Sequence, residues 1–197
     1  MLTRSRLRFR VAAAGLGGAL ILATAACGNT ASNDAAGAGT ASTAAVGGAA
    51  PAGVFKTVTG AEIDIASYRG KPTLLWFVAA GCSSCTASIP ALAGHLDELR
   101  ADGVDVAVID LYGDLGSGPK AAGSLRSLGQ HLVGSRFDDS AWTWGISSRD
   151  LSFRYDQSGE PDVYYLVDRS GNITYKNTVP VSTMTELLQH AHQSATA

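Results

Sequence analysis

Two cysteines separated by two residues, in the segment Cys82-Ser83-Ser84-Cys85, are the residues of this sequence best suited to chemistry. At the start of a helix, unpaired backbone N–H groups and the positive end of the helix dipole lower a thiol pKa and favour the attacking thiolate. A second thiol one helical turn later can resolve the mixed disulfide that the first has formed. The spacing predicts Cys82 as nucleophile and Cys85 as resolving cysteine. A static disulfide is the weaker interpretation, because this pair closes too small a loop to add much chain-entropy stabilisation.

A C-x-x-C pair is also half of many zinc sites. The only other cysteine is Cys27, so zinc would need two of the four histidines. No two of these histidines have the three-to-five spacing typical of zinc motifs, so we predict no metal and no other cofactor, and we expect the histidines at the surface. They are His95, His131, His190 and His192.

The elements around the pair must hold it at a strand-to-helix junction. Residues 73–79 form a continuous apolar run of strand length, which is typical of a central strand covered on both faces. The run ends just before Cys82. Residues 84–101 have apolar side chains at spacings of three and four, which predicts a helix, interrupted where Pro90 removes a backbone hydrogen bond.

The whole pattern predicts an α/β domain with a central mixed β-sheet flanked by helices and with an N-terminal β-hairpin. Trp142, Thr143 and Trp144 form an aromatic cluster, for which we favour core packing or loop anchoring over a substrate groove. The predicted elements are hairpin strands 55–58 and 62–65, further strands 73–79, 104–111, 162–168 and 173–176, and helices 84–101, 121–132 and 181–192.

Residues 1–27 have the layout of an export signal peptide. Four arginines and no acidic residue precede an apolar run over residues 11–26, which is shorter than the ~20 residues of a membrane-spanning helix. Small residues then lead into Cys27, similar to the lipobox of bacterial lipoproteins, whose cysteine is acylated and becomes the new N-terminus. Lipoboxes usually have leucine at the position of Thr24, so a cut after Ala25 without acylation, or an uncleaved anchor, remains an alternative.

Residues 28–53 are almost wholly Gly, Ala, Ser, Thr and Asn and include no aromatic residue, which predicts a flexible linker. Aromatic and β-branched residues appear from residue 54 onward, and residues 54–197 are enough for one packed domain. Four of the 15 basic residues lie in the signal segment, so the rest of the chain carries 11 basic against 17 acidic residues. That balance argues against a nucleic-acid surface.

Four short motifs surround the cysteine pair. They are Tyr68-Arg69-Gly70-Lys71-Pro72, Trp76-Phe77-Val78-Ala79, Cys82-Ser83-Ser84-Cys85 and Ile89-Pro90. Together they resemble the membrane-anchored thiol–disulfide oxidoreductases of the TlpA and ResA type, and the resemblance covers roughly residues 54–188. It implies a thioredoxin-like fold, exchange of thiols and disulfides with client proteins, and a membrane electron donor or acceptor.

A later stretch carries the same resemblance. Residues 159–168 and 170–173 are similar to the family's "GxPxxFLID" and "DG, I" motifs. The family's proline is cis and faces the cysteine pair, which implies the same for Pro161. A cis proline presents its neighbour's backbone, here that of Glu160, as an edge for an extended client segment. An ordinary trans proline in the turn before a strand is the alternative.

Two positions depart from the family pattern. The tryptophan that usually precedes the first cysteine is Gly81, and the acid usual in the helix two residues before its proline is Ser88. The second change removes a proton acceptor for a buried thiol. Asp110, Asp114 and Glu160 are candidate replacements by fold position, but surface solvation is the favoured role of each, and we assign none.

The sequence therefore predicts an enzyme that reduces or oxidises protein disulfides outside the cytoplasm. We expect a monomer anchored to the outer face of the membrane by the Cys27 lipid, or secreted or periplasmic without it. Two alternatives share the fold. A peroxidase of the peroxiredoxin branch would need Pro-x-x-x-Thr-x-x-Cys, and Ala79 stands at the threonine position. A copper-binding chaperone of the Sco kind uses a wider C-x-x-x-C and a distant histidine, although Cu(I) accepts two thiolates.

Overall fold

The structure, a computed structural model, describes residues 42–196. The predicted signal peptide with Cys27 and the first part of the predicted linker lie outside the described residues. No helix in this described part of the chain is long and apolar enough to cross a membrane. The elements in chain order are β1 (Val54–Thr57), β2 (Glu62–Asp64), η1 (Ile65–Tyr68), β3 (Thr73–Val78), α1 (Ser83–Ala93), α2 (Leu96–Ala101), β4 (Asp105–Asp110), α3 (Gly118–Val133), η2 (Gly134–Asp138), β5 (Trp142–Ser147), α4 (Arg149–Tyr155), β6 (Val163–Val167), β7 (Ile173–Thr178) and α5 (Pro180–Thr196).

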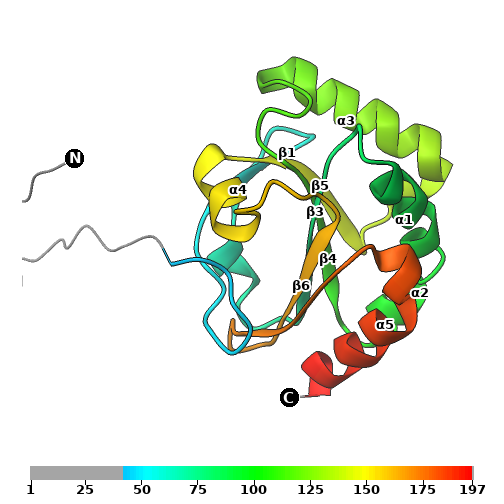
Figure 1. The fold of residues 1–197 in the computed structure, drawn as a ribbon. Coiled ribbons are helices and arrows are strands. Elements are labelled where there is room, and N and C mark those ends of the chain that lie inside the picture. The colour runs from blue at the N-terminus through cyan, green and yellow to red at the C-terminus, as the bar shows by residue number, and fades with distance from the viewer. Residues whose placement is uncertain (1–41, 197) are drawn as a thin grey trace, which may run out of the picture. The chain divides into compact units, whose positions relative to one another are not determined.

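The strands form one mixed sheet in the order β2-β1-β5-β4-β3-β6-β7 (Figure 1). The three strands β3, β4 and β5 run parallel, and the other neighbouring strands are antiparallel. The first two strands pair as the hairpin expected at the N-terminal end of the domain. The predicted α/β class with a central mixed sheet is confirmed.

Helices cover both faces of the sheet (Figure 1). One face carries α1, α2, α3 and α5, and the other carries η1 and α4. Every residue of β3 is buried: Leu74, Trp76 and Val78 pack on the α1 face, and Leu75 and Phe77 on the α4 face. This alternation within a fully covered strand is what the apolar run predicted. It gives the cysteine pair a rigid base.

The helix after β3 breaks at a different place from the one predicted. Residue Pro90 lies inside α1, which continues to Ala93, and α2 begins at Leu96. Proline removes only its own N–H from the hydrogen-bond ladder, and the helix continues past it. The break follows Gly94, which has low helix propensity, and His95 leaves helical geometry with φ −109° and ψ 6°. The prediction of an interruption at Pro90 was therefore wrong.

One central strand and the helix that follows it were not predicted from the sequence. The strand is β5, which lies between β1 and β4, and its Trp142 and Trp144 are 5% and 3% exposed. The expectation that these aromatic residues pack in the core is confirmed, but they do so from a strand. Thr143, Gly145 and Ser147 interrupt the apolar pattern of this segment, so no continuous run marked it as buried.

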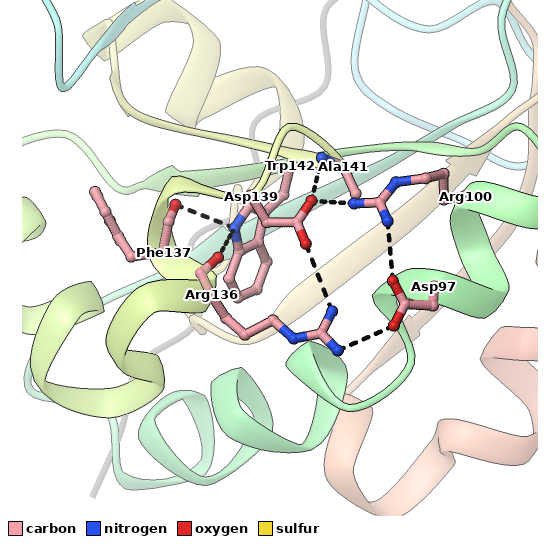
Figure 2. Close-up of polar contacts among 7 residues, drawn as sticks. All are labelled: Asp97, Arg100, Arg136, Phe137, Asp139, Ala141 and Trp142. Carbon is pink, nitrogen blue, oxygen red and sulfur yellow. Dashed lines mark hydrogen bonds and ion pairs between the residues drawn. The ribbon is translucent and has the colours of Figure 1, made fainter.

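A ring of four charges fixes α2 to the start of β5 (Figure 2). Asp97 and Arg100 on α2 face Arg136 and Asp139, and the four side chains form a closed set of ion pairs. Asp97 contacts each arginine at 2.9 Å. The indole N–H of Trp142 donates to the Arg136 carbonyl oxygen at 2.9 Å. Because β5 runs parallel to β3, this ring lies at the end of the sheet away from the cysteine pair.

The segment before β1 is bonded to the domain. The backbone N–H of Ala44 donates to the carbonyl of Arg154 at 2.9 Å, and that of Gly47 to the carbonyl of Ile173 at 2.8 Å. The folded domain therefore begins before residue 54, the predicted domain start. The last part of the predicted linker is packed against the domain and is not free.

Candidate active site

The cysteine pair lies where the loop after β3 enters α1. Cys82 is the N-cap residue of α1 and forms a disulfide with Cys85, with their Cα atoms 5.3 Å apart. The Sγ atom of Cys82 accepts a hydrogen bond from the backbone N–H of Cys85 at 3.1 Å. A sulfur thus occupies the place that a capping oxygen usually fills. In the reduced protein the same N–H and the helix dipole stabilise a Cys82 thiolate.

The two sulfurs differ in exposure. Cys82 is half-buried, whereas Cys85 is 0% exposed. The Ser84 hydroxyl lies 3.2 Å from the Cys82 sulfur, close enough to donate a hydrogen bond to it. Solvent therefore reaches Cys82 and not Cys85. An attacking and a resolving cysteine require this difference.

A buried carboxylate, that of Asp162, lies beside the cysteine pair. The sequence motifs predicted no role for this residue. Asp162 immediately precedes β6 and is 0% exposed. One of its oxygens and the sulfurs of Cys82 and Cys85 all lie within 4.8 Å of one another. Its Oδ1 accepts from the indole N–H of Trp76 at 2.9 Å, and its Oδ2 accepts from the Ser88 hydroxyl at 3.5 Å. Donors from β3 and α1 thus hold this carboxylate against the disulfide.

The place of Asp162 follows from the pairing of β6 with β3. Its backbone N–H donates to the carbonyl of Phe77 at 2.9 Å, which continues the antiparallel ladder to the end of β3. Tyr164 and Leu166 pack on the α1 face, so strand alternation directs Asp162 to the same face. Asp162 has a φ of +75°, and its carbonyl accepts from the N–H of Val179, whose φ is +52°. Both values are unusual for residues other than glycine.

Burial raises the pKa of the Asp162 carboxyl, and hydrogen bonds from Ser84, Trp76 and Ser88 partly oppose that rise. No neighbouring charge is among the causes. A carboxyl whose pKa is moved toward neutrality is suited to accept and return a proton at physiological pH.

A second buried carboxyl lies at the end of β4. Asp110 is 1% exposed, is paired with Val78 across the sheet, and has no hydrogen-bond partner for either oxygen among the described residues. Burial, followed by repulsion from Asp114, raises the pKa of Asp110 to about 8. Asp114 is exposed, and its Oδ2 accepts from the N–H of Ala80 at 2.6 Å, in the loop that leads to the cysteines. These two predicted candidates border the site, but neither belongs to the cluster of sulfurs and carboxylate.

Glu160 and Pro161 lie in the loop between α4 and β6, directly before Asp162. Pro161 is half-buried, and the side chain of Glu160 is exposed. The N–H of Glu160 donates to Oδ1 of Asp156 at 3.0 Å. The backbone N–H of Glu160 is therefore already bonded within the loop.

The histidines are half-buried or exposed and lie outside the cysteine site. His95 contacts Glu98 at 3.1 Å, and His192 contacts Asp102 at 3.0 Å. In the described part of the chain, the one cluster of three side chains spaced for a metal is the two sulfurs with Asp162. The signal that could have pointed to Asp162 in the sequence is its position directly after the proline expected to face the cysteines.

Comparison with known proteins matches one family and several solved structures. A profile of the AhpC/TSA family matches residues 46–114, which is less than half of the chain. A comparison with curated proteins gives no match. The thioredoxin domain of a thiol–disulfide oxidoreductase from Bacteroides vulgatus is 20% identical, with a TM-score of 0.57, covering 75% of this chain and 98% of that one.

Two further structures are similar. A secreted disulfide oxidoreductase of Mycobacterium tuberculosis, homologous to E. coli DsbE, is 21% identical with a TM-score of 0.53, covering 70% of this chain and 92% of that one. A thiol:disulfide interchange protein from a Bacteroides species is 19% identical with a TM-score of 0.54, covering 73% and 90%. The chain therefore has a thioredoxin-like fold, as the sequence motifs implied.

Proposed function

We propose that this protein is an extracytoplasmic thiol–disulfide oxidoreductase that reduces or oxidises the disulfides of client proteins through Cys82 and Cys85. The observation that carries the proposal is the disulfide at the start of α1. Its outer sulfur accepts the Cys85 N–H, and its inner sulfur is fully buried. Proteins of the same fold that exchange thiols and disulfides support it.

In the reducing direction, the Cys82 thiolate attacks one sulfur of a client disulfide. The client S–S bond breaks, a mixed disulfide forms, and the departing client sulfur takes up a proton. Cys85 then loses its proton and attacks the Cys82 sulfur, and the second client sulfur leaves, so that two electrons pass from the dithiol to the client. Oxidation of a client dithiol is the reverse sequence and starts from the Cys82–Cys85 disulfide.

The proposed client site is the loop that carries Glu160 and Pro161. An extended client segment would donate a backbone N–H to the Glu160 carbonyl, in the manner of a strand added to a sheet edge. The cis form of Pro161 is part of this proposal. Asp162, the residue after Pro161, lies close to both sulfurs. This supports the proposed client site, because a client bound at Glu160 would lie beside Cys82.

Export is also part of the proposed function, with residues 1–27 as signal peptide and Cys27 as the acylated residue. Its support is the residue pattern of this segment and the likeness to a secreted disulfide oxidoreductase. Mass spectrometry of the mature N-terminus tests the proposed lipid anchor. An acyl group on Cys27 supports the anchor, and an unmodified N-terminus after a cut at Ala25 contradicts the anchor.

The substitution Cys85→Ser tests the exchange reaction itself. Without the resolving sulfur, Cys82 is expected to stay joined to its clients, so acid-quenched cells should contain mixed disulfides that a reducing agent removes. Cys82→Ser is the matched control, because it removes the nucleophile and leaves one cysteine in the same helix turn. If neither variant forms adducts, or both form them equally, the proposal is wrong.

A second candidate function is the binding of a soft metal ion by the reduced pair. The closeness of the two sulfurs favours it, because thiolates are the ligands that Cu(I) prefers. Anaerobic titration of the reduced protein with Cu(I) against a competing chelator distinguishes the two functions. Retention of one Cu(I) that Cys82→Ser abolishes would favour metal binding, and loss of the ion to the chelator would exclude it.

A further inference from the structure

The buried cysteine needs a partner for its proton. Cys85 is 0% exposed and packs in the core cluster that also contains Trp76, Ile89 and Leu92. Burial in apolar surroundings raises a thiol pKa and excludes the solvent that would otherwise take the proton. In the resolving step, however, Cys85 must react as a thiolate. The proton therefore has to move to a group inside the protein.

Asp162 is the carboxylate placed to take it. The strand β3 (Thr73–Val78), the helix α1 (Ser83–Ala93) and the first turn of α5 carry no charged side chain facing it. On β6, the Tyr164 hydroxyl bonds to the Thr183 hydroxyl at 2.9 Å. Asp110 lies on β4, and the strand β3 lies between β4 and β6. The two cysteines, whose sulfurs lie within 4.8 Å of one of its oxygens, are thus the groups beside Asp162 that can titrate once the disulfide is reduced.

The backbone at this position points to a chemical role as well. A left-handed backbone conformation has an energetic cost for a residue with a side chain, and the φ of Asp162 is +75°. Burying a carboxyl adds a desolvation cost. A glycine at this position would have neither the conformational cost nor the desolvation cost. Such residues persist where their chemistry is used, and strained residues gather at functional sites.

We propose that Asp162 is the proton acceptor and donor of Cys85, an assignment that rests on the proposed exchange reaction. Once Cys82 holds a client in a mixed disulfide, the Asp162 carboxylate takes the Cys85 Sγ–H proton, directly or through one water. The Cys85 thiolate attacks the Cys82 sulfur, the bond from Cys82 to the client breaks, and the client sulfur leaves with the electron pair. In the reverse direction the protonated carboxyl returns its proton to Cys85 as the disulfide opens.

The substitution Asp162→Asn tests the assignment. Asparagine keeps the size of the side chain, can accept the Trp76 N–H bond and tolerates a positive φ, but it cannot take a proton. The reduced protein is mixed with the chromogenic disulfide DTNB in a stopped-flow instrument. Attack by Cys82 releases the first thionitrobenzoate, and resolution by Cys85 releases the second, so one trace reports both steps.

We expect the first phase of Asp162→Asn to be at least as fast as in the wild type, because a carboxylate beside Cys82 disfavours its thiolate. The second phase should slow by roughly 10²-fold, with loss of the carboxyl from its pH profile. A second phase at the wild-type rate with the same pH profile would overturn the assignment and leave the exchange reaction intact. A wild-type protein without a fast first phase would instead refute the proposed function. Asp110→Asn is the comparison variant: if it slows the second phase and Asp162→Asn does not, the acceptor is Asp110 and our assignment fails.

A measurement on the wild-type protein covers the case in which Asp162→Asn does not fold. The carboxyl carbon of Asp162 is titrated by NMR in the oxidised and in the reduced protein. We expect its pKa to differ between the two states, because a titrating thiol borders it in only one of them. Coincident titration curves would overturn the assignment.

Discussion

Replacing Asp110 by asparagine should stabilise the protein, and the gain should grow as the pH rises from 5 to 8. The folded-state pKa of Asp110 is about 8, chiefly because of burial. An aspartate in the unfolded chain titrates near 3.9, so between these values the folded state binds more protons than the unfolded state. The contribution of Asp110 to stability is therefore complete below the unfolded pKa and is lost as the pH rises through the folded pKa.

The size of the effect follows from this difference in pKa. Each pH unit between the two pKa values costs about 1.4 kcal/mol, and this slope flattens close to either pKa. From pH 5 to pH 8 the wild type should thus lose about 3–4 kcal/mol through this one group. Asparagine has nearly the same shape and does not titrate, so Asp110→Asn should avoid the loss.

Urea unfolding of the oxidised proteins at pH 5, 6.5 and 8, followed by tryptophan fluorescence, measures the difference. Glu186→Gln is the control, because it removes a carboxyl from an exposed position. Its free energy of unfolding should stay parallel to that of the wild type across the series. If the advantage of Asp110→Asn is the same at all three pH values, Asp110 is not a neutral buried acid and the reasoning fails.

Two further substitutions test the framework of the sheet. In Gly145→Ala the new Cβ would lie 2.8 Å from the carbonyl oxygen of Lys56 and against the ring of Phe55. The free energy of unfolding should therefore fall by about 1–3 kcal/mol. An unchanged urea midpoint would contradict the packing of β5 on β1. Arg136 lowers the pKa of Asp97 through a hydrogen bond and its charge, and stability from a lowered carboxyl pKa is lost as the pH falls. The stability advantage of the wild type over Arg136→Gln should therefore shrink below pH ~4 and in ~1 M salt, and an advantage that persists under both conditions would argue for packing instead.

The parts of the site that local sequence determines were predictable. A continuous apolar run marks β3 as a covered strand, and the apolar spacing after it marks a helix, so the position of Cys82 at the helix start follows from neighbouring residues alone. The Cys85 N–H bond to the Cys82 sulfur is a consequence of that position. The break at Gly94 was not predictable in the same way, because proline is the stronger sequence signal and the helix accommodates Pro90.

Features that depend on distant segments were not predictable. Asp162 reaches the cysteines only because β6 pairs with β3 in a register that bonds its N–H to Phe77, 85 positions earlier in the sequence. A shift by one residue would turn its side chain to the opposite face. Likewise β5 is buried by β1, β4 and the helices over them, while Thr143, Gly145 and Ser147 interrupt its apolar pattern. Pairing register across the chain, rather than local composition, decides both.

Hydrogen bonding separates the two buried carboxyls as proton acceptors. Asp110 has no hydrogen-bond partner among the described residues, and with a pKa of about 8 it is mostly protonated at pH 7, where it cannot take up a proton. Asp162 is equally hidden, but the donors around it oppose the effect of burial on its pKa. One of these donors is Ser88, at the position where the TlpA/ResA pattern that the sequence resembles has an acid. Its hydroxyl accepts from the N–H of Val181 at 3.1 Å and donates to Asp162, so in this chain the helix α1 supplies a hydrogen bond and the residue before β6 supplies the carboxyl.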